Sequence, residues 1–66
     1  MAVARVSEIT ASSTTGFQDA FQEGINRASA TLRNITGAEI VSQKAKIENG
    51  KVAEYRVRMK VTFILE

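Results

Sequence analysis

The last extended segment has the clearest pattern in the chain, because apolar and polar side chains alternate over residues 54–63. Strict alternation predicts a β-strand with one buried face and one exposed face. The apolar face would carry Tyr55, Val57, Met59, Val61, Phe63 and Leu65. The opposite face would carry Glu54, Arg56, Arg58, Lys60 and Thr62. A chain with such a strand must cover one side of a sheet and leave the other side to water or to partners.

The dipeptide Asn49-Gly50 indicates a tight hairpin that joins this strand to the extended segment before it. A two-residue loop would set charged residues opposite apolar ones, for example Lys44 opposite Tyr55. We therefore expect a three-residue loop, residues 48–50, with its glycine left-handed as a bulge. The expected cross-strand pairs are then Val41 with Val57, Gln43 with Tyr55, and Lys44 with Glu54.

An amphipathic helix is expected between a first strand, residues 3–10, and the hairpin. A polar break follows the first strand, and in it Thr15 and Gln18 fit a capping box. Apolar residues then recur at helical spacing as far as about Asn34. They are Phe17, Ala20, Phe21, Gly24, Ile25, Ala28 and Leu32. Gly24 costs about 1 kcal/mol relative to Ala in mid-helix, so we expect the helix to approach the sheet closely there.

These elements predict an α+β fold of the βαββ type, in one domain that covers residues 1–66. A helix between two strands makes them run the same way, and the third strand then fits between them, antiparallel to both. The expected architecture is a three-stranded antiparallel sheet in the order 1-3-2 that partly wraps one helix. The side chains of the first strand give no clear face assignment. The residues expected in the helix-to-sheet core are Val57, Met59, Val61, Phe21 and Ile25.

Such a domain is expected to be only marginally stable by itself. A chain of 66 residues buries only about 60% of the surface that it exposes when unfolded. It has no Cys and no His, which excludes disulfides and disfavours a zinc site. Self-association is the stabilising device that remains. Without a leader-like pattern or a run of 18 apolar residues, the chain is expected to be cytoplasmic, with no membrane partner.

The charged face of the sheet is the main candidate for function, because it gathers five cations with Glu54 as the only nearby counter-charge. These cations are Lys44, Lys46, Arg56, Arg58 and Lys60. A solvated or interface-paired face is the reading favoured first, and a pocket for a phosphorylated small molecule comes second.

Other functions have less support. No His is available as a base for a Ser or Thr nucleophile, so we expect no enzyme. The aromatic residues fall on core-facing positions, which argues against a nucleic-acid partner. The carboxylates lack the spacing of a calcium loop, although one Glu from each of several subunits could still form a metal site.

Six short stretches, spread over essentially the whole chain, form a further pattern: Val6–Ile9, Ala11–Ser13, Arg27-Ala28, Thr31–Ile35, Tyr55–Val57 and Lys60–Phe63. In length, order and spacing they resemble the dodecin family. The resemblance implies a βαββ subunit that assembles into a hollow homododecamer. In the best-known branch of the family, this shell stores or buffers flavins without catalysis.

The flavin site that the resemblance implies is matched only in part. Gly37 stands where the family has a Trp that stacks on the flavin ring, and Arg56 stands where a Gln contacts the polar edge of the ring. Lys44 matches a basic residue near the flavin phosphate, and Arg58 completes the expected ligand-binding set. A missing ring removes roughly 1–3 kcal/mol per stacked face, so binding of riboflavin or FMN is expected to be weak or lost. The same replacements resemble a calcium-binding branch, so the alternatives are a dodecin that binds calcium or anions and a structural or interaction shell.

Overall fold

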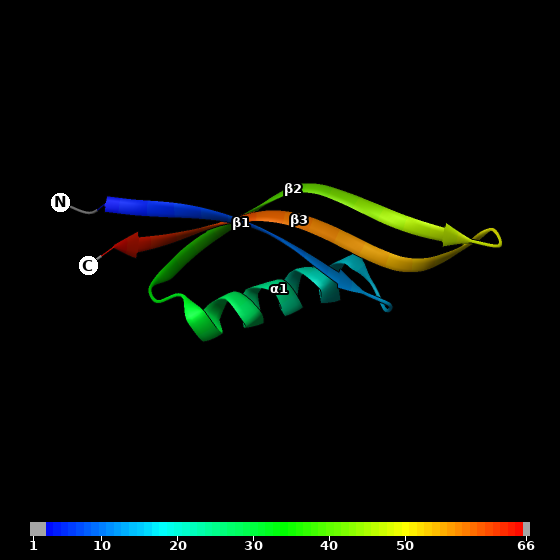
Figure 1. Ribbon diagram of the computed structural model, residues 1–66, viewed down its shortest axis with the longest axis horizontal. Helices are drawn as coiled ribbons and strands as arrows, with labels where there is room; N and C mark the ends of the chain where they lie inside the picture. The colour runs from blue at the N-terminus through cyan, green and yellow to red at the C-terminus, as the bar shows by residue number, and fades with distance from the viewer. Residues whose placement is uncertain (1–2, 66) are drawn as a thin grey trace.

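The computed structural model describes residues 3–65, which form a βαββ unit (Figure 1). Its elements are β1 (Val3–Ser13), α1 (Phe17–Thr31), β2 (Ile35–Glu48) and β3 (Lys51–Leu65). The three strands form one antiparallel sheet in the order β1-β3-β2, with the helix on one side. The predicted fold class and strand order are confirmed.

The helix begins differently from the prediction. Its N-cap is Gly16, which has no side chain to cap the first turn, and the predicted capping box of Thr15 and Gln18 is wrong. The hydroxyl of Thr15 donates instead to the carboxylate of Asp19, while its backbone N–H donates to the Ser13 hydroxyl at 3.0 Å. Because Gly16 occupies the N-cap position, Thr15 lies one residue too early for its hydroxyl to accept from the backbone N–H that a capping box uses, and the hydroxyl donates to Asp19 instead.

The helix also ends before the predicted boundary near Asn34. Its last residue is Thr31, and the backbone N–H of Leu32 closes the final turn onto the carbonyl of Ala28 at 2.8 Å. Leu32 is already extended, and Asn34 adopts a left-handed conformation with φ of 61°. Asn tolerates this region better than most residues, so the chain can turn there into β2.

The hairpin register is the main correction to the sequence prediction. Asn49 and Gly50 both have positive φ, 52° and 74°, and form a two-residue loop in which Glu48 pairs with Lys51. The predicted three-residue loop is wrong because the extra residue lies within β3, as a bulge at Ala53. The resulting pairs, which replace the predicted ones, are Gln43 with Val57, Lys44 with Arg56, Ala45 with Tyr55, and Lys46 with Glu54.

A second bulge, at Val41, moves the pairing back by one residue, so that Ile40 lies opposite Met59. The two bulges therefore confine the shifted register to the middle of the hairpin. Within that segment, charged residues of β2 share a face with charged residues of β3. The sequence was right to require a bulge for this purpose, and wrong about its position.

The core lies between α1 and the central strand. Val57, Met59 and Val61 are fully buried, and the helix contributes Ala20, Gly24 and Ala28. The other residues that the sequence predicted for this core, Phe21 and Ile25, are partly buried and pack against its edge. The predicted core is confirmed, with small helix residues at its centre.

Gly24 is the point of closest approach between helix and sheet. A Cβ atom at this position would lie 2.6 Å from Cε of Met59 and 3.1 Å from Cβ of Ala11. Both distances are shorter than carbon atoms adopt in normal contact, so a larger side chain would require the flexible end of Met59 to move and Ala11 of β1 to shift slightly. The predicted close approach is confirmed.

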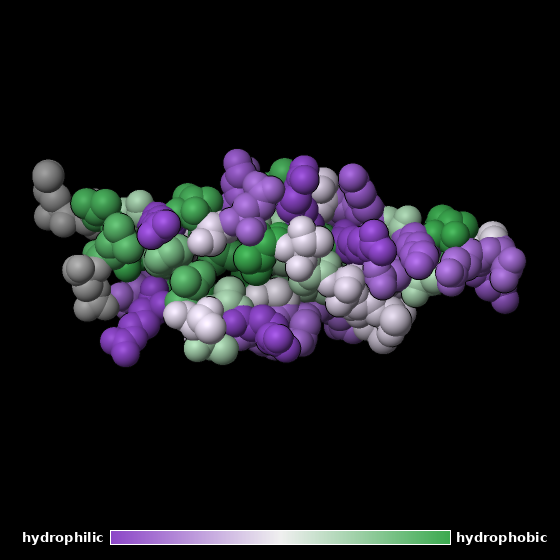
Figure 2. Space-filling view, viewed as in Figure 1, coloured by the Kyte–Doolittle hydropathy of each residue, from purple (hydrophilic) through white to green (hydrophobic). Residues whose placement is uncertain are grey.

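The hairpin continues past the N-terminal end of the helix (Figure 1). The helix packs against β1 and β3, and the described residues extend over 52 × 19 × 13 Å. Beyond it, Ile47 and Val52 are 57% and 44% exposed. Hydrophobic surface also gathers at the opposite end, where both termini lie, with hydrophilic surface between (Figure 2). Both ends of the sheet thus expose apolar side chains to solvent in the single chain.

We predict that Val57→Asp prevents folding, whereas Arg58→Gln has a small effect. The first places an unpaired charge in the core and should cost more than about 4 kcal/mol, and the second removes an exposed charge and should cost less than about 1 kcal/mol. Circular dichroism during thermal unfolding measures both. The reverse order of stability would contradict the face assignment of β3.

Candidate functional site

The face of the sheet that points away from α1 carries its polar side chains in rows across the three strands. The register defines these rows as Glu8–Lys60–Glu39, Thr10–Arg58–Ser42 and Ser12–Arg56–Lys44. In the first row, Lys60 lies between two carboxylates. The other two rows contain cations and hydroxyl groups and no carboxylate of their own.

A shallow cavity of about 190 Å³ lies over these two rows. Its lining comes from all three strands and consists of Thr10, Ser42, Lys44, Arg56 and Arg58. Ammonium, guanidinium and hydroxyl groups are all hydrogen-bond donors, so the lining suits an anion with several acceptor oxygens. Pockets for whole drug-sized ligands usually span about 300–1,000 Å³, so this one suits a charged group rather than a complete flavin.

Lys44 and Arg56 lie directly opposite each other on neighbouring strands. Like charges in such a position destabilise a sheet, and an anion between them would relieve the repulsion. Among residues 3–65, Lys44 has no carboxylate within ion-pairing distance. This side chain is therefore the open cationic position of the cavity.

The two arginines are each paired with a carboxylate at the rim. Nε of Arg56 lies 2.5 Å from Oε1 of Glu54, and Nε of Arg58 lies 3.5 Å from Oε2 of Glu8. Both guanidinium side chains are about half exposed, at 51% and 49%, so each pair contributes only about 0–1 kcal/mol. The expectation that Glu54 is the only nearby counter-charge is wrong, because β1 places Glu8 on the same face.

The structure brings together three of the four residues predicted for the ligand site. Lys44, Arg56 and Arg58 share the cavity, whereas Gly37 lies opposite Thr62, farther along β3. At about 3.4 Å per residue, Gly37 is roughly 20 Å from Arg56 along the sheet. One chain cannot place both positions against the same small ligand, so only different copies of the chain could combine them.

Sequence reasoning missed the two hydroxyl groups of the cavity, those of Thr10 and Ser42. The face of β1 could not be assigned from its mixed residues, and the position of Ser42 depends on the bulge at Val41. Isolated hydroxyl residues within strands form no motif. Their pairing with Arg58 was the only available signal, and it required the correct register.

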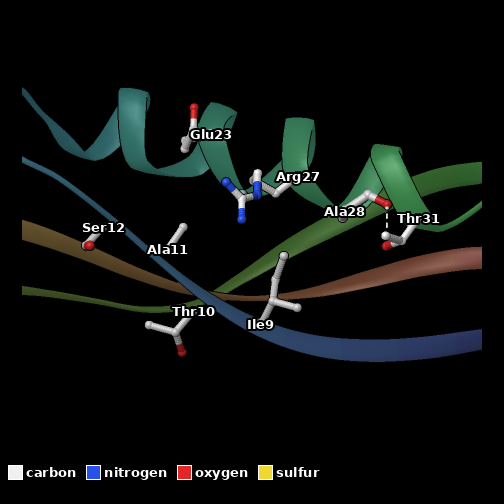
Figure 3. A pocket seen from close by; sticks show the side chains of 9 residues that line it. Ile9, Thr10, Ala11, Ser12, Glu23, Arg27, Ala28 and Thr31 are labelled. Atoms are coloured by element: carbon white, nitrogen blue, oxygen red, sulfur yellow. Dashed lines mark hydrogen bonds between the residues drawn. The ribbon is translucent and has the colours of Figure 1, made fainter.

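A second, larger cavity of about 460 Å³ lies between β1 and α1. Its floor is apolar around Ala11 and Gly24, and Arg27 extends from the helix across the space toward the strand (Figure 3). Thr31 closes one end by donating a long hydrogen bond, 3.4 Å, to the carbonyl of Ala28. With a single cation on one side, this cavity has less donor chemistry than the sheet face.

Residues 3–65 contain neither a metal-binding cluster nor a membrane-spanning helix. Over that range, no three carboxylates lie close enough together to hold a metal ion. The helix in the described part of the chain is neither long nor apolar enough to cross a bilayer.

Comparisons with known proteins agree with this architecture. The family model described as Dodecin matches residues 3–66. A dodecin from Streptomyces davaonensis is 38% identical over 98% of this chain and 96% of that one, with a TM-score of 0.93. A structure of Thermus thermophilus dodecin is 32% identical over 100% and 98%, with a TM-score of 0.95.

A more distant structure is that of calcium dodecin from Mycobacterium tuberculosis, described as a calcium-chelating antigen with a novel calcium-binding site. It is 25% identical over 97% of this chain and 91% of that one, with a TM-score of 0.84. The search of curated protein sequences found no significant match.

Proposed function

This chain belongs to the dodecin family, and from that membership we propose that it is a non-catalytic protein that binds or stores a phosphorylated small molecule. The observation that carries the proposal is the cavity in which Lys44, Arg56 and Arg58 meet two hydroxyl groups. A phosphate group offers several acceptor oxygens and about two negative charges. It would relieve the repulsion between Lys44 and Arg56, which lie opposite each other on neighbouring strands.

The residues present do not fit a flavin as the main ligand. A flavin binds largely through stacking on its ring, and Gly37 offers no ring. Apart from the two chain neighbours of Gly37, no atom of residues 3–65 lies within 4 Å of the place of its missing side chain. Arg56 also puts a positive charge where the family has an amide. The phosphate of FMN could bind at Lys44, but exposed ion pairs of about 0–1 kcal/mol do not replace a stacked ring.

The binding unit in this proposal is a cytoplasmic homododecamer of single-domain subunits. Support comes from the family, from the small size of the chain and from the apolar side chains exposed at both ends of the sheet. A two-stranded arm is marginally stable on its own, so the part of the hairpin beyond α1 gains most from contact with a neighbouring copy. Without a bound small molecule, the same shell would serve a structural or interaction role.

Calcium binding is the second candidate function, because the similar Mycobacterium tuberculosis protein is described as a calcium dodecin. One chain does not gather three carboxylates within residues 3–65. A calcium site would therefore have to combine carboxylates from several copies around a symmetry axis.

We predict that inorganic pyrophosphate binds to the wild type and that Lys44→Gln weakens this binding by about threefold to tenfold, because the unpaired cation of the cavity is lost. Equilibrium dialysis measures the effect. Lys60→Gln is the matched control, since it removes the same charge from the same face at a position between two glutamates. Equal losses in the two variants would place the anion outside the cavity.

We predict that FMN fluorescence is quenched weakly or not at all by the wild type and strongly by the double variant Gly37→Trp, Arg56→Gln. A restored ring should tighten binding by about tenfold to a hundredfold for each stacked face. The control is Gly37→Leu, Arg56→Gln, which adds apolar bulk without a ring. Tight quenching by the wild type would contradict the loss of the flavin site.

We predict that sedimentation equilibrium finds a species of twelve copies of the 7.2 kDa chain. The physical reason is that a domain of this size without cross-links buries too little surface when alone. A folded species with the mass of one chain would contradict the shell, and with it the storage role.

A further inference from the structure

The carboxylates of Glu8 and Glu54 form ion pairs with the two guanidinium groups that an anion in the cavity would bind. Glu54 binds Arg56 along the same strand, and Glu8 reaches Arg58 from β1. We infer that Glu8 and Glu54 are internal counter-ions that an anionic ligand has to displace, so that they determine how tightly the cavity binds and which anions it accepts. This inference rests on the proposed function, because it concerns the same cavity.

Displacement has a defined starting point in the structure. Lys44 is the cavity cation that has no carboxylate partner within residues 3–65, so an incoming anion meets no competitor there. Arg56 lies directly opposite on the central strand. An anion held by Lys44 therefore comes within reach of Arg56 and competes with Glu54 for its guanidinium group.

The second exchange takes place at Arg58, which lies one row farther along the same face. Thr10 and Ser42 flank it on the neighbouring strands, so both hydroxyl groups can donate to an oxygen that replaces the carboxylate of Glu8. Released carboxylates return to water at little cost, because their side chains are already 45% and 31% exposed for Glu8 and Glu54, respectively.

The need for two exchanges selects anions by charge. A monoanion such as acetate can replace one carboxylate, and the other arginine then stays paired with its own glutamate. A phosphate or pyrophosphate group has more charge and more acceptor oxygens, and it can replace both carboxylates at once. Glu8 and Glu54 therefore act as specificity determinants in favour of multiply charged ligands.

The test is equilibrium dialysis of the purified full chain against inorganic pyrophosphate, with acetate as the monovalent competitor. Glu8→Gln and Glu54→Gln should each raise the association constant of pyrophosphate by about two- to fivefold, because one competing ion pair is removed. Both variants should also make acetate a better competitor. Glu39→Gln is the matched control, since it makes the same charge change on the same face beside Lys60 rather than beside an arginine of the cavity.

The outcomes separate this inference from the proposed function. Stronger binding in the Glu8 and Glu54 variants than in Glu39→Gln supports it. If the wild type binds pyrophosphate through Lys44 and all three glutamine variants behave alike, the inference is overturned and the proposed function stands. If neither the wild type nor any variant binds pyrophosphate, the proposed function fails and the inference fails with it.

Discussion

The contact between α1 and the central strand is the interaction on which the rest of the structure depends. Three adjacent inward-facing residues of β3 are completely buried, and Gly24 lets the helix descend onto Met59 until their atoms touch. Within residues 3–65, these three are the largest side chains that are fully buried. Because β3 also pairs with both other strands, fixing its inner face fixes the outward direction of Arg56 and Arg58.

The charged face is therefore a product of the same strand that forms the core. Its cations have different neighbours across the strands. Carboxylates from β1 and β2 flank Lys60, whereas hydroxyl groups flank Arg58. The cationic character of the cavity comes from this local arrangement and not from the net charge of the chain, which is only +2.

Period-two alternation was enough to predict β3, its buried face and, with the helix pattern, the order of the strands. The position of Gly24 was also readable, since glycine in mid-helix requires a reason. The register of the hairpin could not be predicted from the sequence. A bulge at Ala53 and a longer loop satisfy the same alternation, and only the packing of the hairpin distinguishes them. The site was predicted to the extent that its cations lie on β2 and β3. Its hydroxyl groups and Glu8 depended on strand pairings that local sequence does not specify.

Because of the bulges at Ala53 and Val41, substitutions on the outward face and substitutions at buried positions have different consequences. They confine the shifted pairing to the segment that carries Ser42 and Lys44, and the pairing returns at Ile40 to the phase that it has at the hairpin turn. Substitutions on the outward side of this segment can therefore change the charged face without changing Val57, the fully buried residue that pairs with Gln43. A lineage with this fold can exchange an aromatic ligand for a charged one through a few surface replacements, while selection for folding acts on a different set of positions in the same strand.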